Sequence, residues 1–302
     1  MAAKTHLTRR WLIQQIGISP SRFYDWQQRQ GQPNQHNGPV PKKHWLLPQE
    51  QAAIIDYCQH QIELGYRRLT YMMLDEDIAA VSPATTYRIL KEQGLLHRWQ
   101  PTGAVKKHGF DQPQQVHQHW HIDISFVNIL STFAFLISIL DGASRYVVHH
   151  ELRAHMTEVD VEITLQRARE KFPHATPRII SDNGPQFISK ELKQYLRSCQ
   201  LDHVFTSPYH PQSNGKLERF YRTIKTEEMR RTSYLSLEEA RQRIERYIIY
   251  YNTVRLHSAI WYLTPEDVLF GRTELRLKQR QDKLDRAKKY RQQQFQLMTE
   301  KI

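Results

Sequence analysis

One segment, residues 178–225, constrains the fold and the chemistry of this chain more than any other. It opens with a short apolar run that predicts a strand ending at Asp182. An Asn-Gly-Pro turn follows directly, because glycine and proline interrupt regular structure. A polar, glycine-containing loop then precedes a helical stretch that carries Glu218, with thirty-five residues between the two acids. The segment therefore predicts that a strand end and a helix each present one carboxylate.

A third acid, Asp123, lies inside an alternating apolar run, residues 119–127, which predicts another strand. Carboxylates on a strand centre, a strand end and a helix can supply the oxygen ligands that Mg²⁺ prefers, and they leave room for phosphate oxygens. Two such ions, roughly 3.5–4 Å apart, can hold both the attacking and the leaving oxygen of a phosphoryl displacement. Each acid alone would be interpreted as an ordinary turn or surface residue. The joint pattern is what favours a metal site.

The segments around these acids resemble the catalytic core of retroviral integrases and of insertion-sequence transposases with an Asp, Asp, thirty-five, Glu signature. The resemblance extends over about residues 115–272 and rests on the runs WHIDISFV, SDNGPQF, SPYHPQSNGKLERFYRTIK, YNTVRLHSAI and TPEDVL. It implies that Asp123, Asp182 and Glu218 are the catalytic, metal-binding carboxylates. It also implies that Lys225 contacts DNA.

The order of predicted elements fits the fold that this resemblance implies. Three strands (119–127, 132–140 and 145–152) come first, followed by a helix that Thr157 caps, a strand, a helix, a short strand and the Glu218 helix. We expect an α/β ribonuclease-H-like core with a mixed five-stranded sheet and flanking helices, preceded by all-α helix-turn-helix domains. The expected boundaries are 1–33 and 49–97 for the two helix-turn-helix domains, 34–48 and 98–115 for the linkers, 116–232 for the core, 233–272 for its helical extension and 273–302 for a basic tail.

The first 30 residues predict two short helices separated by Gly17. Ser19-Pro20 has the form of a helix cap followed by a first-turn proline. Phe23 and Trp26 are expected to face the first helix, which leaves Arg22 and Tyr24 exposed to contact DNA, as in a helix-turn-helix. A plain helical hairpin is the alternative.

Residues 49–64, 67–78 and 83–94 predict a second helical domain. Its third helix again begins with a cap and a proline, at Ser82-Pro83. The basic character of the chain favours DNA contact over packing alone. The residues expected to project toward DNA are Thr85, Thr86, Arg88 and Lys91.

On the Glu218 helix, Leu217, Phe220, Tyr221 and Ile224 form an apolar stripe at helical spacing. Glu218, Arg222 and Lys225 fall on an adjoining row, which suits a DNA strand laid across the helix. The alternative is a simple Glu218–Arg222 ion pair on a solvated face. The loop at 209–215 is expected either to order on DNA or to be a plain connection. Further DNA contacts are expected from Lys216, Asn214, Tyr209, His210 and Asn183.

Composition narrows the class of partner. The formal charge is +12 and the isoelectric point is near 9.6, which points to a polyanion; acidic lipid is conceivable, but no apolar run is long enough to span a bilayer. Two cysteines and no signal-peptide pattern predict a reducing cytoplasm, here next to the bacterial nucleoid. Retroviral integrases carry a His-His-Cys-Cys zinc module, which two cysteines so placed cannot build, and this favours the transposase branch.

Two smaller questions concern single residues. His117, His119 and His121 alternate beside Asp123, and they are expected to be exposed rather than to bind zinc or manganese. Asp141 precedes a glycine and is expected to serve a turn rather than a metal.

The sequence therefore predicts a DNA transposase that binds element ends, frees 3′-hydroxyls by hydrolysis and joins them to target DNA. The expected cofactors are two Mg²⁺ per site, for which Mn²⁺ can substitute. A homodimer or higher oligomer on DNA is expected, because two ends must be handled together. The alternatives are a non-catalytic DNA-binding regulator and a nuclease that cuts without joining.

Overall fold

The computed structural model describes residues 8–31, 45–61, 63–96, 113–130, 132–206 and 215–299. The chain divides into two compact units. The first comprises Met1–Trp45 with Lys289–Ile302, and the second comprises Leu46–Lys288. Among the described helices, none has both the length and the apolar character that a bilayer span requires.

The first unit contains the helices α1 (Arg9–Ile16) and α2 (Pro20–Gln28). Gly17 ends α1 in the left-handed region (φ 71°), and the Ser19 side chain caps α2 by accepting a hydrogen bond from the Arg22 backbone N–H. Both helices and both signals were predicted. Trp26 was expected to face α1, but it is 56% exposed and so is not covered by that helix. The α2 helix buries no residue, so a pair of short helices is too small to cover an indole ring.

A second group of helices belongs to the second unit: α3 (Pro48–Gln59), α4 (Tyr66–Asp75) and α5 (Pro83–Glu92). They enclose a core of their own around Ile54 and Met73, which are fully buried. The predicted helices are present with shorter ends. The prediction for Thr86 was wrong, because its side chain is buried and its hydroxyl accepts a hydrogen bond from Thr70 (2.8 Å). It holds α5 against α4 and does not project outward.

Among the described residues, five strands form one sheet with the order β3-β2-β1-β4-β5. Strands β1 (His119–Ile129), β2 (Thr132–Asp141) and β3 (Val147–Arg153) are antiparallel neighbours. Strands β4 (Arg178–Ser181) and β5 (His203–Phe205) add in parallel on the other side of β1. This is the mixed five-stranded sheet that was expected, and with its helices it confirms the ribonuclease-H-like fold.

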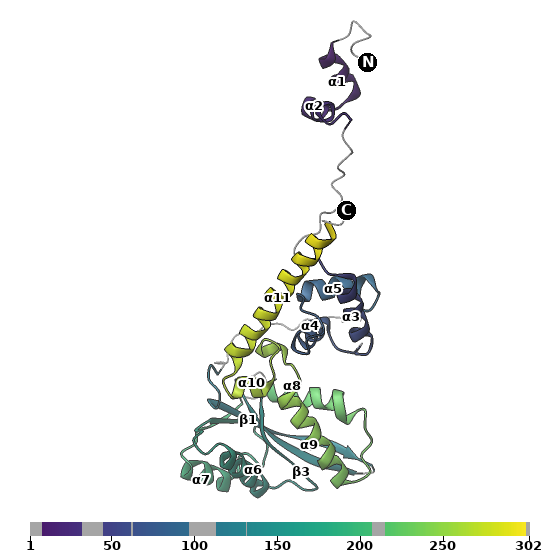
Figure 1. Cartoon of the computed structure of the whole chain (residues 1–302). Coiled ribbons are helices and arrows are strands. Elements are labelled where there is room, and N and C mark those ends of the chain that lie inside the picture. Colours follow the sequence, from purple (N-terminus) through teal and green to yellow (C-terminus); the bar gives the residue numbers. More distant parts are fainter. Residues whose placement is uncertain are drawn as a thin grey trace. The chain divides into compact units, whose positions relative to one another are not determined.

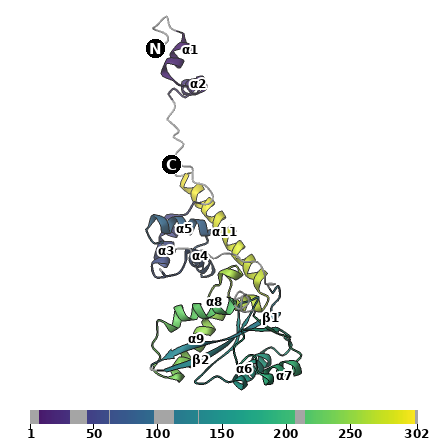
Figure 2. The ribbon, with the colours of Figure 1, turned by 180° about the vertical axis from the view of Figure 1, so that it is seen from behind.

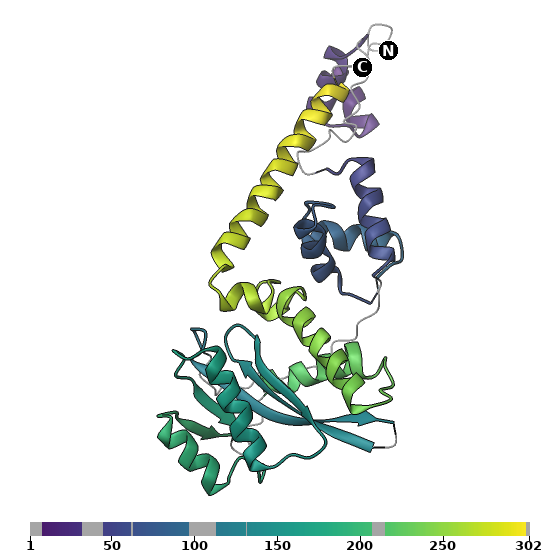
Figure 3. The same ribbon diagram turned by 60° about the horizontal axis from the view of Figure 1, so that its bottom comes forward.

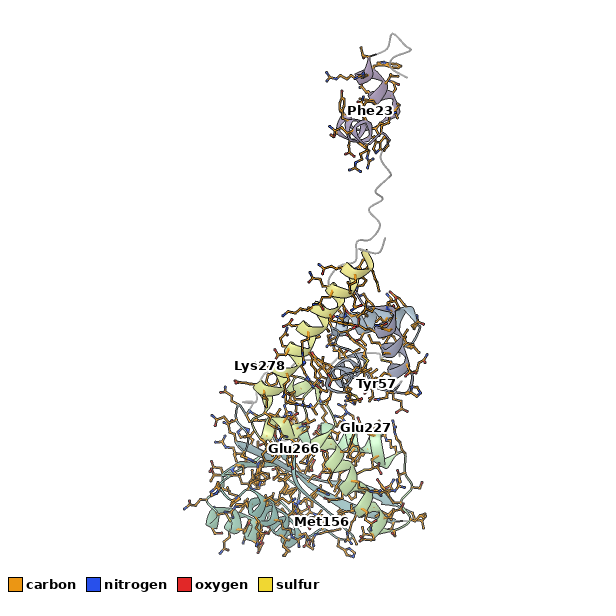
Figure 4. All side chains as sticks on the ribbon, in the orientation of Figure 1. Phe23, Tyr57, Met156, Glu227, Glu266 and Lys278 are labelled. Atoms are coloured by element: carbon orange, nitrogen blue, oxygen red, sulfur yellow. The ribbon has the colours of Figure 1, made fainter. Side chains whose placement is uncertain are left out.

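Helices cover both faces of the sheet. The α6 (Glu158–Lys171) and α7 (Lys190–Ser198) helices pack on one cluster of buried side chains, and α8 (Gly215–Ile224) and α9 (Leu237–Thr253) pack on another. Figures 1 and 2 show α6 and α7 grouped apart from α8 and α9. Strand β1 serves both layers, because Trp120 lies in the first cluster and Val127 in the second. Met156, labelled in Figure 4, belongs to the first.

Strand β1 is buried on both faces at its start, over residues 119–122, and alternates only from Ser125 to Ile129, where the odd-numbered residues are buried. Phe126 was expected on the buried face with Trp120, but it is 57% exposed. It lies in an edge-to-face arrangement with Phe133 and beside Phe135 on the neighbouring strand. The β1–β2 hairpin therefore carries its own aromatic contacts.

The α8 helix continues as a π-helix, η3 (Lys225–Met229), which holds one more residue per hydrogen-bonded turn than an α-helix. After α9 come the 3₁₀ turn η4 (Ser258–Ile260) and the short helix α10 (Pro265–Leu269). The basic tail, for which the sequence left a helix or a frayed end open, forms the long helix α11 (Thr273–Thr299), visible as a single rod in Figure 3. Within the second unit, Arg280 of α11 binds both carboxylate oxygens of Asp75 (2.8 and 2.6 Å).

Candidate active site

Asp123 lies on the central strand, opposite Ser138 of β2. Its Oδ1 accepts a hydrogen bond from the backbone N–H of Ile124 (2.8 Å). Its backbone carbonyl accepts one from the Tyr221 hydroxyl of α8 (2.5 Å). Tyr221 also donates to the carbonyl of Leu136 on β2 (3.2 Å). One buried phenol therefore fixes α8 against two strands at the level of Asp123.

Asp182 directly follows β4, the parallel neighbour of β1. Its Oδ1 accepts a hydrogen bond from the Gly184 N–H (2.9 Å), and a Cβ on Gly184 would lie 3.1 Å from this oxygen. Glycine therefore suits the turn because the backbone approaches the carboxylate closely. The neighbouring Asn183 donates to the carbonyl of Thr206 (3.0 Å), beyond the end of β5. Its amide is used to join the β4 and β5 ends.

Glu218 is exposed in the first turn of α8. It lines an open cleft of about 340 Å³ together with Asp123. The other residues that line this cleft are Ile124, Ser125, Tyr221, Arg222, Lys225 and Arg230. The cleft thus combines two acids from different elements with cations from α8, from η3 and from the residue after η3.

The other two acids affect the pKa of Asp123. Burial raises it to about 7; the hydrogen bond from Ile124 opposes the rise, the charges of Asp182 and Glu218 add to it, and Lys225 lowers it. Neighbouring carboxylates repel one another when ionised, and a cation bound between them relieves this repulsion. The oxygen-only donor set fits a hard divalent cation.

The described residues contain no group of three His, Cys, Asp or Glu side chains arranged closely enough to hold a metal ion. The assignment of Asp123, Asp182 and Glu218 as metal ligands therefore stays a prediction. It is supported by the mutual effect of the three charges on the pKa of Asp123.

Comparison with known proteins identifies the family. Two integrase core domain families match this chain, one over residues 113–211 and the other over residues 199–265, so that together they span about half of it. Residues 113–265 of this chain therefore contain an integrase core domain. This confirms the predicted relationship to insertion-sequence transposases with an integrase-like core.

Relatives of the integrase core include the transposase for insertion sequence element IS904 of Lactococcus lactis, 28% identical over 150 residues, which are 49% of this chain and 59% of that protein. An uncharacterized 39.2 kDa protein of insertion element IS476 from Xanthomonas euvesicatoria is 23% identical over 222 residues, 71% of this chain and 62% of its own. The chain spans about three fifths of the length of these relatives. Among solved structures, a simian T-cell lymphotropic virus intasome complex with a PP2A regulatory subunit covers 72% of this chain and 74% of its own, at 17% identity and a TM-score of 0.48.

The predicted basic row of the integrase core is present, because Arg222 and Lys225 line the cleft with Glu218. Within the described part of the chain, Glu218 and Arg222 form no ion pair, so the alternative of a simple surface pair is not observed. Arg222 is exposed, and Lys225 is partly buried. Their contact with DNA stays a prediction.

Lys216 was also predicted to contact DNA; it does not line the cleft, and its contact with DNA stays a prediction. Its Nζ is buried, and no described residue forms a hydrogen bond with it. Burial lowers the pKa of Lys216 to about 7, and the charge of Arg145 adds to the effect while Asp141 opposes it. Lys216 precedes Glu218 by two residues, which places it about 200° away around the helix.

The other residues predicted to contact DNA differ in how exposed they are. On α5, Arg88 and Lys91 are exposed, and Thr85 is partly buried with its hydroxyl bonded to Ser82 (3.0 Å). Arg22 and Tyr24 are exposed on α2. Tyr209, His210 and Asn214 lie outside the described residues.

The sequence interpretation missed Arg230 and the role of Tyr221. Arg230 follows the π-helix, so a count at α-helical spacing does not bring it toward Glu218. Tyr221 was assigned to the apolar stripe, and its position three residues after Glu218 was the available signal that its hydroxyl reaches the Asp123 strand.

Two expectations about neighbouring residues also have outcomes. His119 and His121 are buried, so the expectation that they are exposed was wrong; a Cβ on Gly142 would lie 3.0 Å from the His121 ring, so the turn packs directly on it. Asp141 accepts hydrogen bonds from the backbone N–H groups of His117, Ala143 and Ser144. This confirms that it serves the turn.

Proposed function

We propose that this protein is a DNA transposase that cuts the ends of its element and joins the freed 3′-hydroxyls to target DNA. The observation that carries the proposal is one cleft of an integrase core, which Asp123 and Glu218 line together with three cations. Sequence relatives within insertion elements support the same function.

Asp123, Asp182 and Glu218 would hold the divalent ions, Mg²⁺ or Mn²⁺. Such ions supply Lewis-acid activation of the attacking oxygen and stabilise charge on the phosphoryl group. The protein contributes position, because Tyr221 fixes α8 on β1 and thereby sets where Glu218 stands relative to Asp123. Arg222, Lys225 and Arg230 would bind phosphates of the DNA and orient the scissile bond.

The test uses labelled duplexes taken from the DNA that flanks the gene, a supercoiled target plasmid and Mg²⁺. The wild-type protein should yield joined product. Asp182→Asn should bind the ends but neither cut nor join them. Asp202→Asn is the matched control, since this acid is 79% exposed at its side chain in the same core, and it should behave as wild type.

The alternatives are distinct outcomes of the same assay. Cut but unjoined ends would identify a nuclease, and binding without cutting would identify a regulator. Cleavage by Asp182→Asn at the wild-type rate would overturn the site assignment.

Transposition must act on two ends, so we further propose that the active form on DNA is a dimer or higher oligomer. Light scattering of the complex with paired ends would measure this. Joining of both ends by a complex that holds one protein chain would contradict it.

A further inference from the structure

The helix α4 carries two stripes of side chains that have different neighbours. One stripe closes the core of the helical domain, where the Thr70 hydroxyl donates to Thr86 of α5 (2.8 Å). The second stripe, spaced by three and four residues, consists of Arg68, Tyr71 and Asp75. We call it the docking stripe, because each of its members contacts α11 or a segment of the integrase core.

Arg280 of α11 makes the central contact with the docking stripe. Its guanidinium donates to both carboxylate oxygens of Asp75 (2.8 and 2.6 Å) and to the backbone carbonyls of Trp261 and Tyr262 (3.1 and 2.7 Å). The Arg280 side chain is only 6% exposed. Breaking these bonds would leave buried polar groups unpaired, so Arg280 joins α4, α11 and the turn at 261–262 in one arrangement.

The turn that accepts Arg280 has an unusual backbone. Trp261 and Tyr262 both lie in the left-handed region (φ 56°), which favours glycine. Such residues persist only where the surrounding contacts hold them. Tyr262 stacks on the Tyr71 ring of α4 (4.9 Å between centroids), and the Arg280 guanidinium lies 4.8 Å from the centroid of the same ring. The docking of α4 therefore supplies contacts that hold this turn.

The α11 helix also binds the C-terminal end of α4. Lys283 donates to the carbonyls of Leu74 and Asp75 (2.9 and 3.0 Å), and it forms an ion pair with Asp77 (2.8 Å). The last carbonyls of a helix lack partners within the helix and carry partial negative charge, which a lysine satisfies. The position of α4 along α11 is therefore set by its end as well as by its side.

The first residue of the docking stripe contacts the π-helix η3. Arg68 lies 3.8 Å from the carboxylate of Glu227, which is labelled in Figure 4. Glu227 accepts two hydrogen bonds from Arg255 (2.6 and 2.7 Å) and one from Tyr247 (2.8 Å). Lys225 of the same π-helix lines the active-site cleft. One turn of helix thus contacts the helical domain through one residue and the cleft through another.

We propose that the docking of α4 fixes the position of α5 relative to the active-site cleft, and that Arg280 and Asp75 are positioning residues that determine which phosphodiester reaches the three acids. The proposal rests on the proposed function, because it takes Arg88 and Lys91 of α5 to contact the element end. The bond between α4 and α5 transmits the position of one helix to the other. Successive phosphates of a strand are about 3.4 Å apart along the duplex, so a shift of α5 by that distance moves the cut by one bond.

The first test maps cleavage of a labelled element end at nucleotide resolution, with Mg²⁺. Wild type should cut at one bond. In Arg280→Gln and in Asp75→Asn, the share of cuts at neighbouring bonds should rise about tenfold, since a misplacement of about 1 Å can change a rate by about 10²-fold. The double variant should resemble either single variant, because all three lack the same ion pair.

The matched control is Arg286→Gln. Arg286 is an exposed arginine of the same helix, and it bonds within that helix to the Asp282 carbonyl (3.4 Å). This variant should keep the wild-type cleavage pattern. A loss of stability alone would reduce the total amount of cutting without moving the cuts, so the position of the cuts separates positioning from a purely structural role. Asp75→Asn preserves the shape of its side chain and leaves Arg280 in place, so the test does not depend on replacing a buried arginine.

The second test needs neither DNA nor metal. Spin labels on Lys91→Cys of α5 and Arg197→Cys of α7 measure the distance between the helical domain and the core. Cys199→Ser removes the partly exposed native thiol, whereas Cys58 is buried and is retained. The distance distribution should be narrow in this background and broader when Arg280→Gln or Asp75→Asn is added. Arg286→Gln should leave it narrow.

The two tests separate failure of this inference from failure of the proposed function. An unchanged distance distribution in both variants would overturn the inference, as would a broader distribution with cuts at the wild-type bond alone. Moved cuts in Arg286→Gln would also overturn it. A wild-type protein that cuts no end contradicts the proposed function, and the distance measurement then still decides whether Arg280 and Asp75 hold α4 on the core.

Discussion

Asp123 and Glu151 are acids of the same sheet with opposite surroundings. Glu151, on β3, meets Arg153 (2.5 Å) and Arg167 (2.7 Å). Burial alone would raise its pKa, but hydrogen bonds from His149 and Arg153 and the charges of both arginines lower it to about 2. Asp123 has acids for neighbours, and its pKa rises to about 7. An acid that forms ion pairs within the protein stabilises the fold. An acid that lies near other acids is instead suited to bind a cation from solution.

The largest effect expected from this contrast is on chemistry. Asp123→Asn should lower joining activity by at least about 10³-fold, because about 4 kcal/mol of transition-state stabilisation is lost with a metal ligand. Its melting temperature should stay level or rise, since a buried charge and its repulsion are removed. Joining assays and thermal unfolding on one preparation measure both. A fall in stability as large as the fall in activity would show that Asp123 is structural.

Glu151→Gln should give the reverse pattern. Removing this charge leaves Arg167 without an acidic partner and Arg153 with only Asp160 (2.6 Å). We expect a loss of about 2 kcal/mol in the free energy of unfolding, which is below the loss for a fully buried pair because Arg167 is half exposed. Urea titration measures the loss. Activity per folded molecule should equal that of wild type, and a defect confined to joining would place Glu151 in the active site.

As the pH falls, the contributions of Glu151 and Asp123 to the stability of the fold should change in opposite directions. Because the folded pKa of Glu151 lies below its ordinary value of 4.5, its stabilising effect is present above pH 4.5 and is lost as the pH falls toward 2. The folded pKa of Asp123 lies above 3.8, so its ionisation destabilises the fold progressively from about pH 4 to about 7. Urea midpoints at pH 3, 5 and 7 should fall less steeply toward acid in Glu151→Gln than in wild type. Identical pH profiles would contradict the assigned ion pairs.

The smallest effect concerns metal binding without DNA. At ten times its dissociation constant, Mg²⁺ should stabilise the wild type by about 1.4 kcal/mol. Glu151→Gln should show the same gain, and Asp123→Asn should show little or none. Thermal shift with Ca²⁺-free buffers and increasing MgCl₂ measures it. Equal stabilisation of Asp123→Asn would place the ion elsewhere.

Much of the fold could be predicted because it rests on local signals. The cap-and-proline starts at Ser19 and Ser82, the Thr157 cap and the alternation of β1 each have a short-range physical cause. These signals gave the order of the elements, and the family resemblance implied that the Asp123 strand lies next to the strand that delivers Asp182. The family resemblance supplied the roles.

The errors share a different cause. Helical spacing tells which residues form a row, but not which neighbour covers that row. Thr86 was expected to project toward DNA although Thr70 covers it, and Lys216 was expected to contact DNA although its amine is buried. The π-helix at 225–229 shifts the register by a residue that no composition signal reveals, which is why Arg230 was missed. Such features are decided by contacts between distant segments.

The hydrogen bonds of the Tyr221 hydroxyl affect which substitutions this protein can accept during evolution. It ends on the peptide oxygens of positions 123 and 136, not on side chains, so substitutions at either position leave the anchor intact. Loss of chemistry by mutation of an acid would therefore not loosen the helix. A descendant that had lost one of the three acids could therefore keep α8 anchored to both strands.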